Sequence, residues 1–230
     1  MSDIILRDGE RLDDLLIDDR KIIQNPSYYM LTSDAILLAR FAKVRKGEKV
    51  CDLGTGSGII PLHMALTYEG GDYTGIEIQE CMADMASRSV VLNSLEDRVR
   101  VVCRDMRGYG AECRESYDVV TSNPPYRPLG AGEVTAKNTP SMIARHEVTI
   151  TLSSLLDEVS ALLRYGGRFY MIHRADRLAE IVYELKSRHL EPKEIVNIIR
   201  KGDTADTVMI SATKGGKSGV KVSIMDLRGE

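Results

Sequence analysis

The sequence predicts an α/β fold in which a mostly parallel sheet is covered by helices on both faces. Strand-like apolar runs alternate with segments of helical spacing along most of the chain, the pattern of repeated β-α-β units. The first clear run ends in a glycine-rich turn that opens a helix. The last two β-rich runs are joined by a short polar stretch, which is typical of a hairpin and predicts an antiparallel strand at one end of the sheet.

The elements follow in order along the chain. Residues 1–30 are expected to form a hairpin extension, with Asp-Gly at 8–9 and β-rich stretches around 15–17 and 21–24. Thr32-Ser33-Asp34 supplies a helix N-cap ahead of the apolar run 35–41. Parallel strands are expected at residues 49–53, 72–77, 99–102, 117–121 and 167–173, with helices at 59–68, 79–94, 152–163 and 176–188. The terminal hairpin takes residues 193–200 and 207–213.

This pattern indicates one domain of 230 residues. Its parts are the hairpin extension at 1–30, a core at 31–213 and a basic tail at 214–230, in which residues 214–221 look like a linker. The chain shows no internal repeat and no low-complexity tract, so no domain boundary is expected inside it.

Composition limits the classes of function. No apolar run approaches the roughly 18 residues of a membrane span, and the N-terminus lacks the features of a secretory signal, so we expect a cytoplasmic protein without membrane association. The four cysteines and four histidines show no metal-ligand spacing, and no metal site is expected. Residues 1–163 hold 18 basic and 25 acidic side chains, whereas residues 164–230 hold 13 and 9. The basic side is therefore C-terminal.

The stretch DLGTGSG, residues 52–58, indicates a ligand-binding loop. Glycines let a ligand approach the backbone, and the free N–H groups of a helix start favour hydrogen-bond acceptors. Asp52 would repel a pyrophosphate and attract a cation such as an amino acid's ammonium group. The dinucleotide pattern G-x-G-x-x-G is also missing here, so the loop favours S-adenosylmethionine over NAD.

Acidic residues at two later strand ends fit the same ligand. Glu77 lies 23 residues after Gly54, where an acid accepts hydrogen bonds from ribose hydroxyls, and Asp105 follows the third strand, in position for the adenine amine. The alternative interpretation is a tight turn with two acids that cap helices. The order of strand, loop, helix and strand-end acids favours ligand binding.

Asn123-Pro124-Pro125-Tyr126 follows the fourth strand and predicts chemistry on an amino nitrogen. The Asn123 side-chain oxygen and the Pro124 carbonyl can each accept a hydrogen from an NH₂ group, which aims the nitrogen lone pair at a methyl group. The prolines stiffen the loop, and Tyr126 can stack on a planar base. A simple polyproline turn is the alternative.

These motifs resemble those of the class I S-adenosylmethionine-dependent amino-group methyltransferases. The resemblance covers residues 30–213 and rests on DLGTGSG, GIEI at 75–78, RDM at 104–106 and SNPPY at 122–126. Within that family, residues 10–24, 27–42 and 144–147 (ERLDDLLIDDRKIIQ, SYYMLTSDAILLARFA and ARHE) are similar to the bacterial tRNA(Val) adenine-N6 methyltransferase group, which modifies the adenine next to the anticodon.

The resemblance implies a Rossmann-like class I methyltransferase fold with a seven-stranded sheet whose last strand is reversed. It implies S-adenosylmethionine as the cofactor, tRNA as the partner and Asn123, Pro124, Pro125 and Tyr126 as the catalytic residues. The expected cofactor contacts are Ser33, Asp52, Gly54, Thr55, Gly56, Gly58, Glu77, Ile78, Asp105, Met106 and Asn123. The expected substrate contacts are Tyr126, Arg127, Lys137, Arg145 and His146.

Adenine N6 in tRNA leads among the possible substrates, and other amines stay open. A protein glutamine amide and guanine N2 in rRNA carry the same NH₂ group, although glutamine methyltransferases usually have a helical N-terminal domain. A donor-binding module without catalysis is weakest, because the NPPY peptide is intact. Further cationic candidates for RNA phosphates, each of which could equally be a solvated charge, are Arg174, Arg177, Lys201, Lys214, Lys217 and Lys221.

Overall fold

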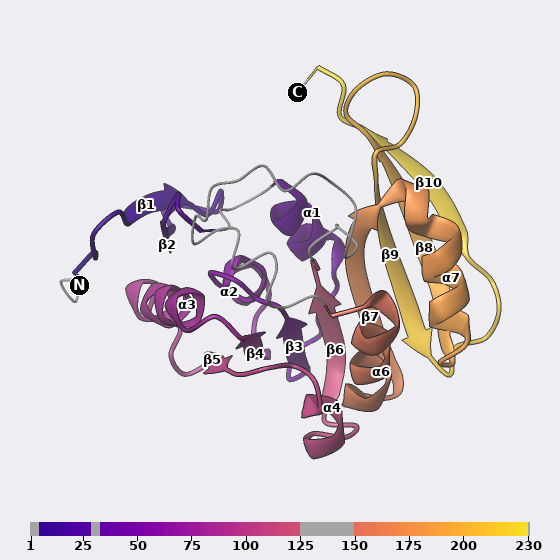
Figure 1. Ribbon diagram of the computed structural model, residues 1–230, viewed down its shortest axis with the longest axis horizontal. Helices are drawn as coiled ribbons and strands as arrows, with labels where there is room; N and C mark the ends of the chain where they lie inside the picture. Colours follow the sequence, from indigo (N-terminus) through magenta and orange to yellow (C-terminus); the bar gives the residue numbers. More distant parts are fainter. Residues whose placement is uncertain (1–4, 29–32, 125–149, 230) are drawn as a thin grey trace, which may run out of the picture.

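The computed structural model describes residues 5–28, 33–124 and 150–229. It contains a two-stranded hairpin and an eight-stranded sheet with the strand order β10-β8-β9-β7-β6-β3-β4-β5 (Figure 1). The strands are β1 (Arg11–Asp14), β2 (Lys21–Gln24), β3 (Lys49–Leu53), β4 (Asp72–Glu77), β5 (Val99–Cys103), β6 (Tyr117–Ser122), β7 (Leu163–Arg174), β8 (Leu190–Ile199), β9 (Thr207–Lys214) and β10 (Lys221–Asp226). The helices are α1 (Ser33–Phe41), α2 (Ile59–Thr67), α3 (Glu80–Leu92), α4 (Tyr109–Glu112), α6 (Leu152–Leu162) and α7 (Leu178–Lys186), with a 3-10 turn η1 (Ala175–Arg177).

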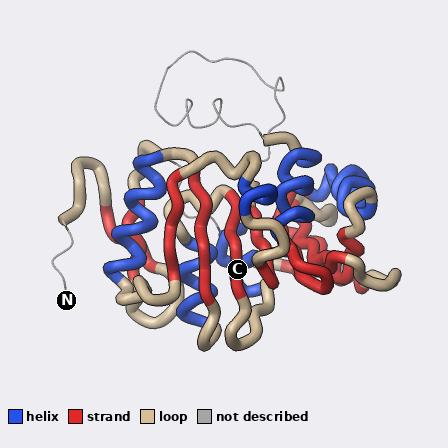
Figure 2. The backbone as a smooth tube through the Cα atoms, turned by 90° about the horizontal axis from the view of Figure 1, so that it is seen from below, coloured by secondary structure: helices blue, strands red, loops and turns tan. Residues whose placement is uncertain are grey.

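The predicted fold class is confirmed. Strands β5, β4, β3, β6 and β7 are parallel neighbours, and β9 runs antiparallel to both β7 and β8. Helices α1, α2 and α3 pack on one face of the sheet, and α4, α6 and α7 on the other (Figure 2). This is the layered arrangement expected of β-α-β units.

The sheet has eight strands, so the expected seven is wrong; the eighth, β10, begins where the linker-like stretch 214–221 ends. Lys221–Asp226 form β10, which pairs in parallel with β8 at the edge of the sheet. Met225 and Leu227 pack against the core from this strand and the residue after it, which is the apolar contact that holds the tail down.

The N-terminal hairpin is present, but one of its strands differs from the expected one. β2 takes the expected residues, whereas its partner is Arg11–Asp14 and not the stretch around 15–17. Leu16 and Asp18 both have positive φ values, 56° and 46°, so this stretch turns the chain between the strands.

The core lies on both faces of the sheet because buried apolar residues occupy successive positions along the strands. In β6, Val119 contacts the cluster under α1 and α2, whereas Val120 contacts the cluster under α6 and α7. In β7, Tyr170 belongs to the cluster under α1 and α2, and Phe169 belongs to the cluster under α6 and α7. Continuous apolar runs are therefore what this sheet requires.

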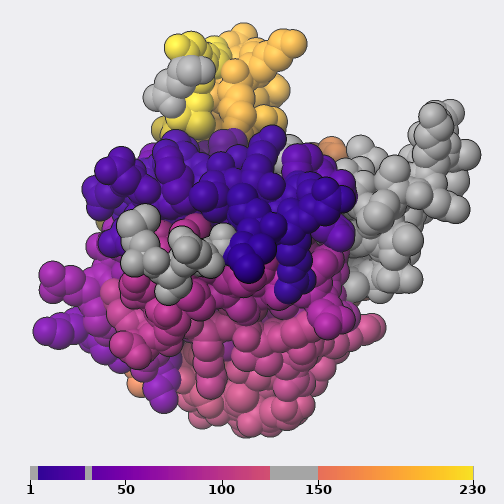
Figure 3. Space-filling view, turned by 90° about the vertical axis from the view of Figure 1, so that its left-hand side faces the viewer, coloured from indigo at the N-terminus to yellow at the C-terminus, as the bar shows by residue number. Residues whose placement is uncertain are grey.

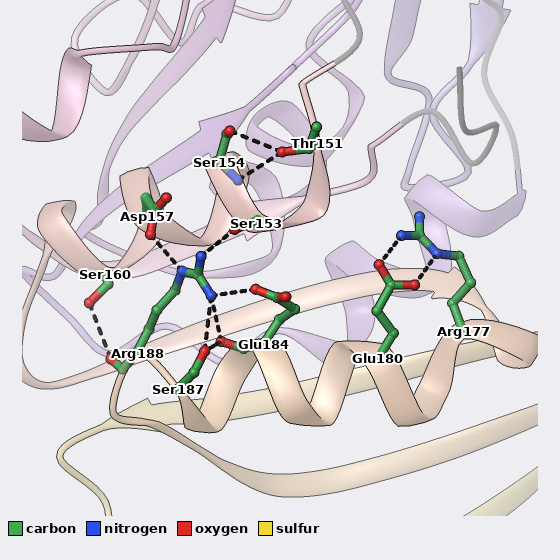
Figure 4. A network of polar contacts seen from close by, with 10 residues as sticks. All are labelled: Thr151, Ser153, Ser154, Asp157, Ser160, Arg177, Glu180, Glu184, Ser187 and Arg188. Carbon is green, nitrogen blue, oxygen red and sulfur yellow. Dashed lines mark hydrogen bonds and ion pairs between the residues drawn. The ribbon is translucent and has the colours of Figure 1, made fainter. Parts of the chain in front are cut away.

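A polar network joins α6 to α7 at the surface (Figure 4). Arg188 donates from Nε to Asp157 Oδ1 at 2.7 Å and from Nη1 to the Glu184 carbonyl at 3.0 Å. Its third nitrogen, Nη2, donates to Ser153 Oγ at 2.5 Å. One guanidinium thus links the end of α7 to two residues of α6.

The helices of the described segments are all too short or too polar to cross a bilayer.

We expect Ile198→Ala in β8 to lower the free energy of unfolding by about 2–4 kcal/mol, because Ile198 is fully buried and its loss leaves a cavity. The control is Ile224→Ala in the neighbouring strand β10, where the side chain is 67% exposed and the loss should stay under about 1 kcal/mol. Urea unfolding at pH 7.5 measures both. Equal losses would contradict the burial that we describe.

Candidate active site

The candidate site lies where the carboxyl ends of β3 and β6 meet. From β3 the chain adds β4 and β5 on one side of the sheet, and β6 and β7 on the other. Such a reversal of strand order opens a crevice outside the carboxyl ends of the strands, where ligands bind in open α/β sheets. In the register of the two strands, Asp52 pairs with Thr121 and Leu53 with Ser122.

Two side-chain hydrogen bonds tie these strand ends together. Thr121 Oγ1 donates to Asp52 Oδ1 at 2.6 Å, and Ser122 Oγ donates to the Leu53 carbonyl at 2.9 Å. All four residues are buried. The glycine loop and the loop that begins at Asn123 therefore leave the sheet side by side from a fixed junction.

Asp52 is a buried carboxyl with one satisfied oxygen. Its Oδ2 has no hydrogen-bond partner among the described residues, and neither does Thr55 Oγ1. Burial raises the pKa of Asp52 to about 6, against the opposing effects of the Thr121 hydrogen bond and of the nearby Thr55 hydroxyl group, which lies outside hydrogen-bond geometry. Two buried polar atoms are thus left for a ligand at the start of the loop.

The glycine loop is held close to β4. The Gly54 and Thr55 N–H groups both donate to the Ile76 carbonyl, at 2.9 and 3.0 Å. Thr55 lies so near β4 that a Cβ on Gly75 would come within 2.8 Å of its Cγ2 atom. At Gly56, φ is +59°, a conformation that an L side chain rarely adopts.

Glu77, at the end of β4, holds the glycine loop through a backbone hydrogen bond. Its Oε2 accepts the Gly56 N–H at 2.8 Å, and its Oε1 accepts the Gln79 N–H at 2.9 Å. Burial raises the pKa of this carboxyl, while the two backbone hydrogen bonds act in the opposite direction. Ile78, the next residue, is half-buried at the same strand end.

Asp105 and Met106 lie after β5, on the same edge of the sheet. Asp105 accepts from the Arg107 backbone N–H at 2.9 Å and from Arg107 Nε at 2.7 Å. The Arg107 side chain lowers the pKa of the Asp105 carboxyl. The Met106 methyl group would lie 3.6 Å from a Cβ on Gly54, so Met106 borders the glycine loop.

The structure places only part of the remaining expected site. Asn123 and Pro124 are half-buried directly after β6. Ser33 is exposed at the start of α1, where the next residue, Asp34, pairs with Arg200 beyond β8. Gly58 precedes α2 with φ +85°. Six expected residues lie outside the described ones: Pro125, Tyr126, Arg127, Lys137, Arg145 and His146.

The sequence did not single out the support that the N-terminal hairpin gives to the loop. Gln24, buried at the end of β2, donates from Nε2 to Ser57 Oγ at 2.5 Å. The Ile23 N–H donates to Ser89 Oγ of α3 at 2.9 Å. Figure 3 shows the N-terminal residues, in indigo, lying across this face of the molecule. A polar residue that ends the apolar run KIIQ was the available signal.

The side chains suit a ligand with a cationic group and hydroxyls better than a metal ion. No group of three or more His, Cys, Asp or Glu side chains that could hold a metal occurs in the parts of the chain that the structure describes. A buried carboxylate with an unpaired oxygen attracts a cation, and the three positive-φ glycines leave the loop backbone open to an adenosyl ligand. The residues present therefore fit S-adenosylmethionine.

Comparison with known proteins gives the same indication. A family model described as "Methyltransferase small domain" matches residues 32–186. A Bacteroides thetaiotaomicron protein named tRNA1(Val) (adenine(37)-N6)-methyltransferase is 27% identical over 84% of this chain and 80% of its own. A Porphyromonas gingivalis protein of the same name is 30% identical over 80% and 82%.

Solved structures share the fold. Geranyl diphosphate C-methyltransferase from Streptomyces coelicolor, solved with Mg²⁺, geranyl diphosphate and S-adenosyl-L-homocysteine, superposes with a TM-score of 0.58. It is 16% identical, and the match covers 78% of this chain and 79% of that one.

We expect Asp52→Asn to remove a fall in stability between about pH 4 and pH 6. The folded wild-type carboxyl holds its proton more tightly than the unfolded one, whose pKa is near 3.8, so stability is lost as the pH rises toward about 6. The difference amounts to roughly 3 kcal/mol. Asn keeps an oxygen for Thr121 and does not ionise.

Urea unfolding from pH 4 to 7.5 measures this difference. Asp105→Asn is the control, because Arg107 lowers the pKa of Asp105, and this variant should keep the wild-type fall. If the free energy of unfolding changed with pH in the same way for wild type and Asp52→Asn, the raised pKa of Asp52 would be refuted.

Proposed function

Because the chain belongs to the methyltransferase small domain family and is an S-adenosylmethionine-dependent methyltransferase, we propose that it methylates the exocyclic N6 of an adenine in tRNA. The observation that carries the proposal is the buried junction that starts the glycine loop and the Asn123 loop on adjacent strands. The relatives named as tRNA1(Val) adenine-N6 methyltransferases support the choice of amine and RNA. The cytoplasmic location expected from the sequence suits this substrate.

In this proposal, Asp52, Glu77 and the glycine loop hold the cofactor. Asp52 Oδ2 and Thr55 Oγ1, the two unpaired buried atoms, take its polar amino-acid end. Glu77 takes the ribose hydroxyls while it holds the Gly56 N–H. Ile78, Asp105 and Met106, at the ends of β4 and β5, border the adenine. When bound, S-adenosylmethionine would supply an electrophilic methyl group, whose bond to sulfur breaks as the new bond to nitrogen forms, and would leave as S-adenosylhomocysteine.

Asn123 and Pro124 position the target amine. Both are half-buried directly after the anchored residue Ser122, so their acceptor oxygens start from a fixed strand end. The Asn123 side-chain oxygen and the Pro124 carbonyl accept the two N–H hydrogens and leave the nitrogen lone pair free to form the new N–C bond. The nitrogen becomes acidic as that bond forms, and its proton is then lost to solvent. Pro125 and Tyr126 complete the proposed catalytic peptide.

We expect Asn123→Ala to reduce methyl transfer by on the order of 100-fold or more, because one of the two acceptors for the amine is removed. Cofactor affinity should change little. Asn197→Ala, which alters a half-buried asparagine in β8, is the matched control and should retain activity. Single-turnover transfer to tRNA and calorimetric cofactor binding measure the two effects; turnover close to wild type would remove Asn123 from the mechanism.

The substrate itself is tested with labelled cofactor and separated tRNA, rRNA and protein fractions from a strain that lacks the gene. We expect N6-methyladenosine in the tRNA fraction. Methylglutamine in protein or N2-methylguanosine in rRNA, with unlabelled tRNA, would overturn the proposed substrate.

We expect Glu77→Gln to weaken cofactor binding by about 1–3 kcal/mol, because the amide can accept only one of the two backbone N–H groups and binds a hydroxyl less strongly than a charged group does. Calorimetry with S-adenosylhomocysteine and its 2′,3′-dideoxy analogue separates the two causes. A ribose contact predicts a smaller loss for the analogue. An equal loss for both ligands would mean that Glu77 only supports the loop.

A further inference from the structure

Five cationic side chains gather at the carboxyl edge of the sheet on the far side of β6 from the glycine loop; Arg228, after β10, pairs with Asp203 and Asp226, and the other four lie at the ends of β7 and β8. Arg174 is the last residue of β7, and Arg177 ends the turn η1 that follows it. Arg200 and Lys201 follow β8, which runs in the same direction as β7. We call these four residues the edge cations.

The edge cations begin one strand away from Asn123. Ser122 of β6 pairs in register with Met171 of β7, so the chain leaves β6 beside the last three residues of β7, which end at Arg174. Adjacent strands are about 4.8 Å apart, and β9 and β8 follow β7 in the sheet. By strand spacing alone, the backbones of β7 and β8 therefore lie about 5 and 15 Å from that of β6, the strand that ends before Asn123.

Hydrogen bonds connect these positions to one another. Arg174 pairs in register with Thr207 of β9, and Thr207 Oγ1 accepts from Arg200 Nη1 at 2.8 Å. Arg200 also pairs with Asp34 in the first turn of α1. The backbone of β7, β9 and α1 thus holds the line of cations in place.

Each arginine is paired with at least one carboxylate that solvent can reach; for Arg200 this is Asp206, 52% exposed, beside the more buried Asp34. Arg177 Nε donates to Glu180 Oε2 at 2.8 Å (Figure 4), and Arg174 pairs with Asp176. The side chains of Asp176 and Glu180 are 57% and 49% exposed. Exposed pairs of this kind contribute little to stability, so a phosphate can replace the carboxylate at low cost and keep the fork geometry.

The other basic candidates lie at the opposite edge. Lys214 ends β9, where its Nζ donates to the Leu163 carbonyl at 2.7 Å and pairs with Glu115. Lys221 begins β10, and Lys217 lies in the link between these two strands. In Figure 1 this link and the β8–β9 turn lie at opposite ends of the sheet.

From these positions we infer that the edge cations bind RNA phosphates. The bound RNA then extends from the target base over the ends of β7 and β8, on the side of the site away from the glycine loop. The inference rests on the proposed function, because it takes the substrate to be RNA. Lys201, which is exposed and for which the described residues supply no ion-pair partner, offers the most accessible charge. The carboxylates Asp176 and Glu180 compete with the phosphates for Arg174 and Arg177.

The test uses the full chain, a tRNA transcript and binding measured by fluorescence anisotropy at several salt concentrations. We expect R174Q/K201Q to weaken binding by about 10-fold or more, and to lower the slope of log affinity against log salt by about 2, since two phosphate contacts are lost. D176N, which frees Arg174, should tighten binding several-fold. K217Q/K221Q is the matched control at the opposite edge and should bind as wild type does.

Steady-state kinetics with tRNA distinguish a loss of RNA binding from a loss of catalysis. R174Q/K201Q should raise the KM for tRNA and leave kcat at saturating tRNA close to wild type. If the wild-type enzyme methylates tRNA while R174Q/K201Q binds it normally, or K217Q/K221Q loses as much affinity, the surface is wrong and the proposed function stands. If the wild-type enzyme methylates no tRNA, the proposed function fails, and this inference with it.

Discussion

The hydrogen bond from Thr121 to Asp52 is the interaction on which the arrangement of the site depends. It joins β3 and β6 just before their loops leave the sheet toward the crevice, and it satisfies one oxygen of a carboxyl that burial would otherwise leave without partners. The Ser122 hydrogen bond to the Leu53 carbonyl repeats the link one residue further on. The loops that follow start from one rigid point, so their relative position is set by strand pairing and does not need the loops to be rigid themselves.

The order of strands in the sheet turns a charge asymmetry along the chain into one across the molecule. The chain builds β3, β4 and β5 first and then crosses to β6, β7, β8 and β9, so the early and late strands lie on opposite sides of the crevice. The carboxyls Asp52 and Glu77 lie on the early side, and Arg174 and Arg200 on the late side. The C-terminal excess of basic residues is therefore a property of one half of the sheet.

Sequence patterns predicted the strands that enclose the site and missed most of the contacts that support it. The expected ranges 49–53 and 72–77 coincide with β3 and β4, because buried parallel strands are read directly from apolar runs. The Gln24–Ser57 contact joins residues 33 positions apart, and local patterns carry no information about such a pair. Asp105 was expected to face a ligand, yet its carboxylate also binds its neighbour Arg107, a short-range competitor that strand position does not reveal.

The sequence did not predict the eighth strand, and β10 bears on how the chain tolerates truncation. Glycines and lysines before Lys221 look like a linker, but the six residues after them cover the edge of β8. Removal of residues 215–229 would uncover the backbone donors and acceptors of Leu190–Ile199, next to buried Ile195 and Val196. An uncovered apolar strand edge is a template for pairing between molecules. A short segment far from the glycine loop thus moves the edge of the sheet from the largely buried strand β8 to the exposed strand β10.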